Sequence, residues 1–109
     1  MNINDLTLGQ IKEIQALTGN TASESAFVVG EKYFIRTATY HNLGRLIAIT
    51  PNELILEDAS WIADSGRFHD ALATGNLNEV EPYINQVIVS RGGIIDATIW
   101  GHELPRNQK

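Results

Sequence analysis

Arg91 is the residue of this 109-residue chain whose surroundings most suggest chemistry. It begins an Arg-Gly-Gly corner, residues 91–93, between two runs of β-branched residues within 87–100. Two adjacent glycines are typical of a two-residue hairpin turn, because both tolerate a positive φ. The turn does not require an arginine. Arg91 therefore has two interpretations: a surface cation beside a turn, or a guanidinium that a rigid sheet holds at a loop tip to bind a ligand.

The other reactive side chains do not have the spacing that catalysis or metal binding requires. His41, His69 and His102 are far apart, and no His-x-x-x-His pair presents two metal ligands on one element. No Gly-x-Ser-x-Gly sequence provides a nucleophile. The acids at 57–58 and 79–81 fit solvated faces. We therefore expect a non-catalytic protein that uses no metal and no cofactor.

A second candidate group lies in the long segment 58–85. Arg67 lies between Trp61 and Phe68 in the sequence, and an arginine among aromatic side chains is able to stack on a nucleobase. The competing interpretation is that these aromatic residues anchor the segment to the core. A connection of about 28 residues is long for a compact domain, and long ordered connections are often functional.

The composition describes one soluble globular domain with 43% hydrophobic and 19% charged residues. The absence of cysteine excludes disulfides and thiolate metal sites. The net charge of −5 argues against broad adsorption to nucleic-acid phosphate, and so against duplex DNA as a partner. No apolar run is long enough to span a membrane, and no signal peptide begins the chain, so we expect a cytoplasmic protein without a membrane partner.

The elements that must position these residues follow in a simple order. A capping box from Thr7 to Gln10 and a terminal Gly19 predict an N-terminal helix within residues 1–19. A small, polar stretch at 20–26 predicts a flexible linker. A β domain at 27–100 and a polar tail at 101–109 complete the single domain.

The β domain is expected to be a bent antiparallel meander. Aromatic and β-branched residues predict strands at 32–40, 43–49 and 53–57, with turns at His41-Asn42 and at residues 50–52. The segment 58–85 is a long insertion between the third and fourth strands, with a possible helical turn at 68–73 and a short strand at Val80. The hairpin at 87–100 then closes a five-stranded, mostly β small barrel with an N-terminal helix.

Two short sequences in this domain resemble the motifs of the Sm-like family. Gly44-x-Leu46 followed by Leu54-x-Leu56-x-x-Ala59 is similar to the first motif, and residues 89–95 resemble the second, with its Arg-Gly corner. The resemblance implies a strongly bent five-stranded barrel whose copies join edge strands into rings of five to seven subunits. It also implies that loops around a pore bind single-stranded RNA or a nucleotide.

By this resemblance the ligand-binding residues are Arg91 and Gly92, with Asn52 in the first loop standing for the family's base-holding asparagine. That loop, residues 50–53, is one residue shorter than in the family and lacks its acid. The fourth candidate ligand-binding residue is Arg67, which lies in the segment 58–85 near Trp61 and Phe68.

The layout of the chain is also similar to that of small phage-encoded proteins. Some of those are anti-defence sponges that sequester cyclic ADP-ribose isomers or cyclic nucleotides. A phage protein of this kind would act in the host cytoplasm. Three interpretations therefore remain open: an RNA- or nucleotide-binding ring, a sponge for a small anionic signal, and a structural assembly or virion-associated protein without a small ligand.

Overall fold

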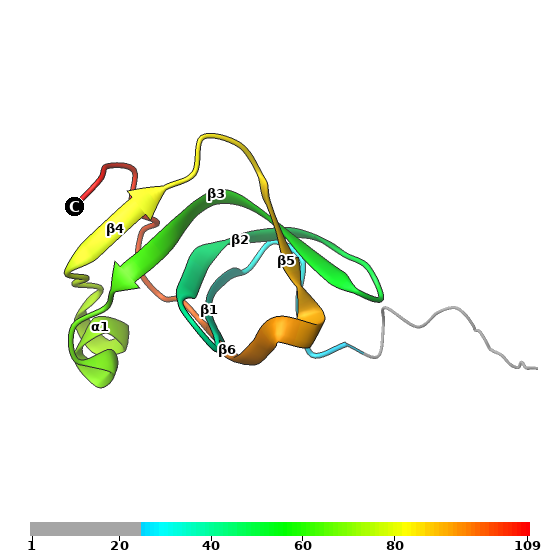
Figure 1. Cartoon of the computed structure of the whole chain (residues 1–109), viewed down its shortest axis with the longest axis horizontal. Coiled ribbons are helices and arrows are strands. Elements are labelled where there is room, and N and C mark those ends of the chain that lie inside the picture. Colours follow the sequence, from blue (N-terminus) through cyan, green and yellow to red (C-terminus); the bar gives the residue numbers. More distant parts are fainter. Residues whose placement is uncertain (1–24) are drawn as a thin grey trace, which may run out of the picture.

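A computed structural model describes residues 25–109 of the chain, so the helix expected within 1–19 lies outside the described residues. The described part is mostly β, as predicted, with one short α-helix (Figure 1). Its elements in chain order are β1 (Lys32–Thr37), β2 (His41–Ile49), β3 (Glu53–Asp64), α1 (Phe68–Thr74), β4 (Glu79–Pro82), β5 (Val87–Ser90), the 3-10 helix η2 (Arg91–Gly93) and β6 (Ile94–Ile99).

The six strands form one antiparallel sheet in the order β4-β3-β2-β1-β6. The long strand β3 has two partners on the same side: its first half pairs with β5, and its second half pairs with β4. Between the halves, Asp58 has a positive φ of 49° and the register with β2 shifts. Because β3 bends here, β5 crosses in front of β2 and β3 (Figure 1). The sheet is not closed, since β5 and β6 do not pair with each other.

The predicted hairpin at 87–100 is wrong. β5 pairs with β3 and β6 pairs with β1, and η2 joins the two strands. Gly92 and Gly93 are not among the glycines with positive φ, and the Ile94 amide instead donates to the Arg91 carbonyl. The physical reason is that a 3-10 turn directs the chain away from β5, so that β6 satisfies the open edge of β1.

The predicted insertion 58–85 is largely regular structure. β3 continues to Asp64 instead of ending at residue 57, and the helical turn at 68–73 and the strand at Val80 are both confirmed. The sheet therefore has six strands, one more than predicted. The turn expected at His41-Asn42 is also wrong, because His41 begins β2 and the preceding turn lies at residues 38–40. The predicted turn at 50–52 is confirmed.

Two hydrophobic cores lie on opposite faces of the sheet. Alternating positions of β1 divide between them: Phe34 belongs to one core, and Tyr33 and Ile35 belong to the other. The first core is covered by α1 and the C-terminal segment, and the second is covered by β5, which contributes Val89. Three successive residues of β1 are therefore buried, which a sheet with one solvated face does not allow.

The segment 101–109 is polar in composition but packs against the domain. Leu104 is buried in the first core, and the Lys109 backbone exchanges two hydrogen bonds with Val80 of β4. The His102 ring contacts Trp100, with 5.1 Å between ring centroids. The C-terminal segment therefore covers the first core and forms hydrogen bonds with the edge of β4. Among residues 25–109, no helix is long and apolar enough to cross a membrane.

Candidate functional site

The predicted site residues Arg91 and Asn52 lie together where η2 meets the β2–β3 turn. The Arg91 amide donates to the Asn52 carbonyl at 2.9 Å. The Arg91 Nη1 donates to the Thr50 carbonyl at 2.8 Å. Arg91 thus holds the turn from both its backbone and its side chain. We call these residues, Thr50, Asn52 and Arg91, the Arg91 junction.

The turn in this junction is itself well ordered by hydrogen bonds. The Thr50 hydroxyl accepts from the Glu53 amide at 2.9 Å and from the Asn52 amide at 3.3 Å. The Thr50 amide donates to the Glu53 carbonyl at 2.9 Å. A threonine followed by Pro51 and a polar residue is a common way to build such a turn. Asn52 and Pro51 are exposed at its tip, so the Asn52 side chain is available to a ligand.

Gly92 lies beside this junction, and Arg67 does not. Gly92 is exposed, and a Cβ added there would meet only the Ser90 hydroxyl, at 3.8 Å. Arg67 is the N-cap residue of α1, which follows the opposite end of β3 from Glu53. The structure therefore brings together three of the four predicted residues and leaves Arg67 at a separate place. Sequence reasoning missed Thr50, because its contribution is a backbone carbonyl that leaves no signal in the sequence.

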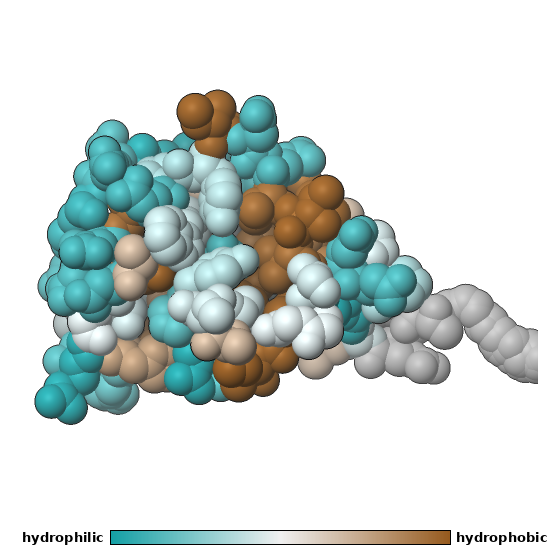
Figure 2. Space-filling model, viewed as in Figure 1, coloured by the Kyte–Doolittle hydropathy of each residue, from teal (hydrophilic) through white to brown (hydrophobic). Residues whose placement is uncertain are grey.

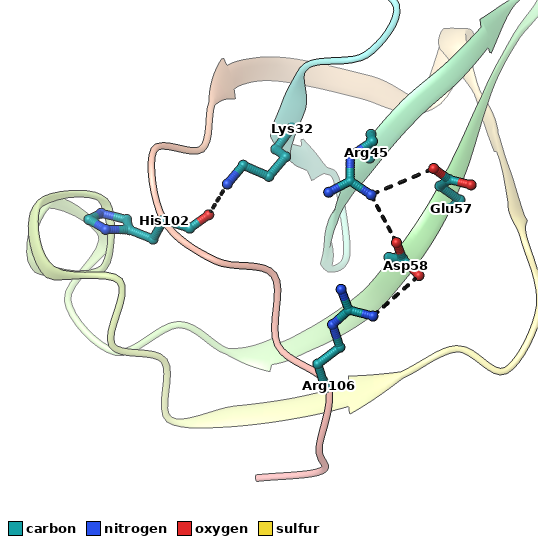
Figure 3. Close-up of polar contacts among 6 residues, drawn as sticks. All are labelled: Lys32, Arg45, Glu57, Asp58, His102 and Arg106. Atoms are coloured by element: carbon teal, nitrogen blue, oxygen red, sulfur yellow. Dashed lines mark hydrogen bonds and ion pairs between the residues drawn. The ribbon is translucent and has the colours of Figure 1, made fainter.

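Most other cations of the described part are held by carboxylates or carbonyls (Figure 3). Arg45 contacts Asp58 at 2.8 Å and Glu57 at 3.6 Å, and Arg106 approaches Asp58 at 3.7 Å. The ammonium of Lys32 donates to the His102 carbonyl. These contacts connect β1, β2, β3 and the C-terminal segment. The charges of Lys32, Arg45 and Arg106 are thereby paired with acceptors within the chain.

Arg36 is the best-paired cation. Its guanidinium donates to both carboxylate oxygens of Asp96, at 2.8 and 2.5 Å, and lies 4.6 Å from the centre of the Phe68 ring. The hydrogen bond from Arg36 holds the pKa of Asp96 below its ordinary value. By contrast, no carboxylate among residues 25–109 lies within 4.0 Å of the Arg91 or Arg67 guanidinium. Arg91 is therefore not neutralised by a carboxylate of the described part.

The outer edges of β5 and β6, which pair with no other strand, carry exposed isoleucines. Ile88 of β5 is 63% exposed, and Ile95 and Ile99 of β6 are 65% and 56% exposed. A hydrophobic patch lies over β5 in the space-filling view (Figure 2). Along β6, an apolar hollow of about 490 Å³ is lined by Phe27 and Tyr33 together with the strand itself. Apolar edges of this kind are templates for pairing with another chain.

Within residues 25–109, no group of three histidine or acidic side chains is placed to hold a metal ion. Comparison of the chain with protein-family models, with curated protein sequences and with solved structures gave no match in any of the three.

Proposed function

We propose that this chain is a non-catalytic, self-associating small-barrel subunit of the Sm-like kind that binds single-stranded RNA or a nucleotide at the Arg91 junction. The observation that carries the proposal is the contact of Arg91 with Thr50 and Asn52. It joins the two short segments whose sequences resemble the family's ligand-binding loops. Arg91 is also one of the two arginines of the described part without a carboxylate partner, which suits it to a phosphate.

The junction has the properties of a preorganised anion site. An arginine has five N–H donors, and the bond to Thr50 uses one of them. That bond fixes the direction of the guanidinium, so less conformational entropy is lost when a phosphate binds. The exposed Asn52 amide lies next to it and offers both a donor and an acceptor to a base.

The open edges of β5 and β6 support self-association. Pairing of β5 in one copy with β6 in the next would satisfy two rows of backbone groups and bury the isoleucines at 88, 95 and 99. The resemblance leads us to expect five to seven subunits in a ring, with the Arg91 junctions around its centre.

Native mass spectrometry of gently purified protein tests the assembly and any retained ligand together. We expect a closed oligomer of five to seven subunits, with added mass of RNA or nucleotide that Arg91→Ala abolishes while the fold is kept. A bare monomer, or retained ligand in the Arg91→Ala variant, would contradict the proposal. Ile95→Lys on β6 should dissociate the oligomer, and Ile84→Lys, at a 97% exposed position outside the strands, is the matched control.

A sponge for a small anionic signal is the second candidate, and the scarcity of unpaired cations favours it. Arg91 lies near the start of β3, where Ser90 pairs with Glu53, and Arg67 follows the other end of β3. The two arginines without a carboxylate partner in the described part therefore do not form a continuous basic track for a long strand of RNA. A thermal shift with cyclic nucleotides or a cyclic ADP-ribose, and none with oligouridine, would select this function. Assembly without either ligand would select the structural, virion-associated alternative.

A further inference from the structure

Three exposed aromatic side chains lie around the second half of β3. Tyr40 precedes β2, Trp61 lies in the second half of β3, and Tyr83 follows β4; they are 42%, 41% and 39% exposed. The rings of Tyr40 and Trp61 meet edge to face, with 6.2 Å between centroids. The Tyr83 hydroxyl lies 3.5 Å from Asn42 Oδ1 on β2. We call these three residues the aromatic surface.

The strand register fixes the positions of these side chains. Trp61 is directly opposite Asn42 on β2 and Glu81 on β4, so all three project from the same face. Tyr83 extends this row, because its amide donates to the Ala59 carbonyl at 2.8 Å. Ala59, two residues before Trp61, is buried in the core that β5 covers. The aromatic surface is therefore the uncovered continuation of that core face, built on rigid strands.

A hollow lies beside the aromatic surface. It measures about 270 Å³ and lies between the β1–β2 turn and β5. Its lining includes Tyr40 and Tyr83 and also Ser90 and Gly93, which flank Arg91 and Gly92 in the sequence. Figure 2 shows this side of the molecule, where residues of intermediate hydropathy lie between a hydrophilic region and the hydrophobic patch over β5. Single exposed aromatics are ordinary, but three in mutual proximity beside a hollow are typical of a binding surface.

The charge around the aromatic surface is negative. The Glu81 carboxylate, beside Trp61, accepts two hydrogen bonds of 3.0 Å from the neutral Gln108 amide and has no cationic partner among the described residues. Glu79, two residues before Glu81 on β4, projects from the same face of the sheet. These carboxylates would repel the phosphates of RNA and attract a cation. The aromatic surface therefore does not suit the ligand of the Arg91 junction.

A proline-rich peptide with basic residues matches both properties. Proline rings in a polyproline II helix pack into the spaces between exposed aromatic side chains, and such a segment loses little entropy on binding. An arginine of the peptide would lie against Glu81 and make a charge-assisted bond. We propose that the aromatic surface docks a proline-rich, arginine-containing segment of another protein, independently of the Arg91 junction.

The test uses fluorescence anisotropy of a fluorescein-labelled peptide with Pro-x-x-Pro repeats and flanking arginines, titrated with the full chain. We expect binding that Trp61→Ala weakens by about 10-fold or more, since central aromatic residues dominate such interfaces. Glu81→Lys should weaken it similarly. Glu53→Lys makes the same change of charge at the opposite end of β3 and should leave the affinity unchanged. Arg91→Ala should also bind the peptide normally, which separates this proposal from the one above.

Several results would overturn the inference. These are no binding of the peptide, equal binding by Trp61→Ala, equal binding of a peptide whose arginines are replaced by glutamate, or displacement of the peptide by oligouridine. Loss of the oligomer in Trp61→Ala would assign the surface to contacts between copies instead. Because Trp61 is exposed, the Trp61→Ala variant should fold, and a thermal melt checks this. In the unmodified chain, a shift of the Trp61 indole NMR signal on addition of the peptide reports the same contact.

Discussion

Gly44 of β2 lies directly against Ala59 of β3. A Cβ added to Gly44 would be 2.8 Å from the Ala59 Cβ and 3.2 Å from the Glu57 carbonyl oxygen, closer than side chains approach. The contact lies between the Leu43–Ser60 and Arg45–Glu57 pairs, where the register of the two strands shifts. Gly44 therefore provides the space in which β3 bends from its β5 half to its β4 half.

Gly44→Ala is expected to destabilise the domain by about 1–3 kcal/mol, because the added methyl group must displace β3 at the bend. Urea unfolding followed by far-UV circular dichroism measures the change. Gly101→Ala is the control, since nothing lies within 4 Å of a Cβ at that position. Equal stability of the two variants would show that the bend does not depend on Gly44.

Leu104→Ala is expected to cost about 2–4 kcal/mol of stability, because Leu104 fills the first core beneath the C-terminal segment. Ile84→Ala removes the same number of carbon atoms from a 97% exposed position and should change the stability by less than about 0.5 kcal/mol. Thermal unfolding of both variants gives the comparison. Equal melting temperatures for Leu104→Ala and Ile84→Ala would show that the C-terminal segment does not stabilise the first core.

Removal of the Arg91 side chain should loosen the β2–β3 turn without unfolding the protein. The bond from Arg91 to the Thr50 carbonyl is half-buried, so Arg91→Ala is expected to cost about 1 kcal/mol. Amide hydrogen exchange should accelerate at Glu53, whose amide donates to Thr50 within the turn. Arg67→Ala, an exposed position away from the junction, should leave exchange at Glu53 unchanged. Unchanged exchange in Arg91→Ala would mean that the turn is ordered by Thr50 alone.

Stability at acidic pH should depend on Asp96. Hydrogen bonding from Arg36 lowers the pKa of Asp96 in the folded state, below the value of about 3.9 in the unfolded chain. The pair therefore stabilises the fold fully above about pH 4, and this contribution disappears as the pH falls through the lowered pKa. The effect is modest, since the two side chains are 37% and 50% exposed.

The variant Asp96→Asn lacks this titration, so its stability should decrease less than that of the unmodified chain as the pH falls from about 5 to about 2. Glu53→Gln removes an exposed carboxylate that has no cationic partner among the described residues, and serves as the control. Parallel pH profiles for the unmodified chain and Asp96→Asn would contradict the prediction.

The strands with a regular pattern were predictable from the sequence, and the way they pair was not. The alternation of Leu54 and Leu56 with more exposed neighbours located β3, and the turn chemistry at 50–52 located its start. The Arg-Gly-Gly corner fits a hairpin and a 3-10 turn equally well on local grounds. What decides between them is the open edge of β1, more than fifty residues earlier in the chain.

The candidate site was predictable only in part. The short motifs placed Arg91 and Asn52 together, but the contacts between them involve backbone carbonyls, which have no sequence signature. The second core was hidden because Tyr33, Phe34 and Ile35 form an unbroken apolar run, and such a run does not show which residues belong to which face. Trp61 is evident in the sequence as an aromatic residue, but Tyr40 and Tyr83 lie just before β2 and just after β4, and only the pairing of those strands with β3 brings them near Trp61.

The pairing of β6 with β1 also has a consequence for synthesis of the chain. Arg36 and its partner Asp96 are 60 residues apart in the sequence. At the usual translation speed of about 5–20 residues per second, the edge of β1 stays unpaired for about 3–12 s until β6 has been synthesised. During this time a nascent chain exposes an apolar strand to its neighbours on the same polysome. The sheet can therefore be completed only after β6 has been synthesised, because Asp96 follows its partner Arg36 by 60 residues.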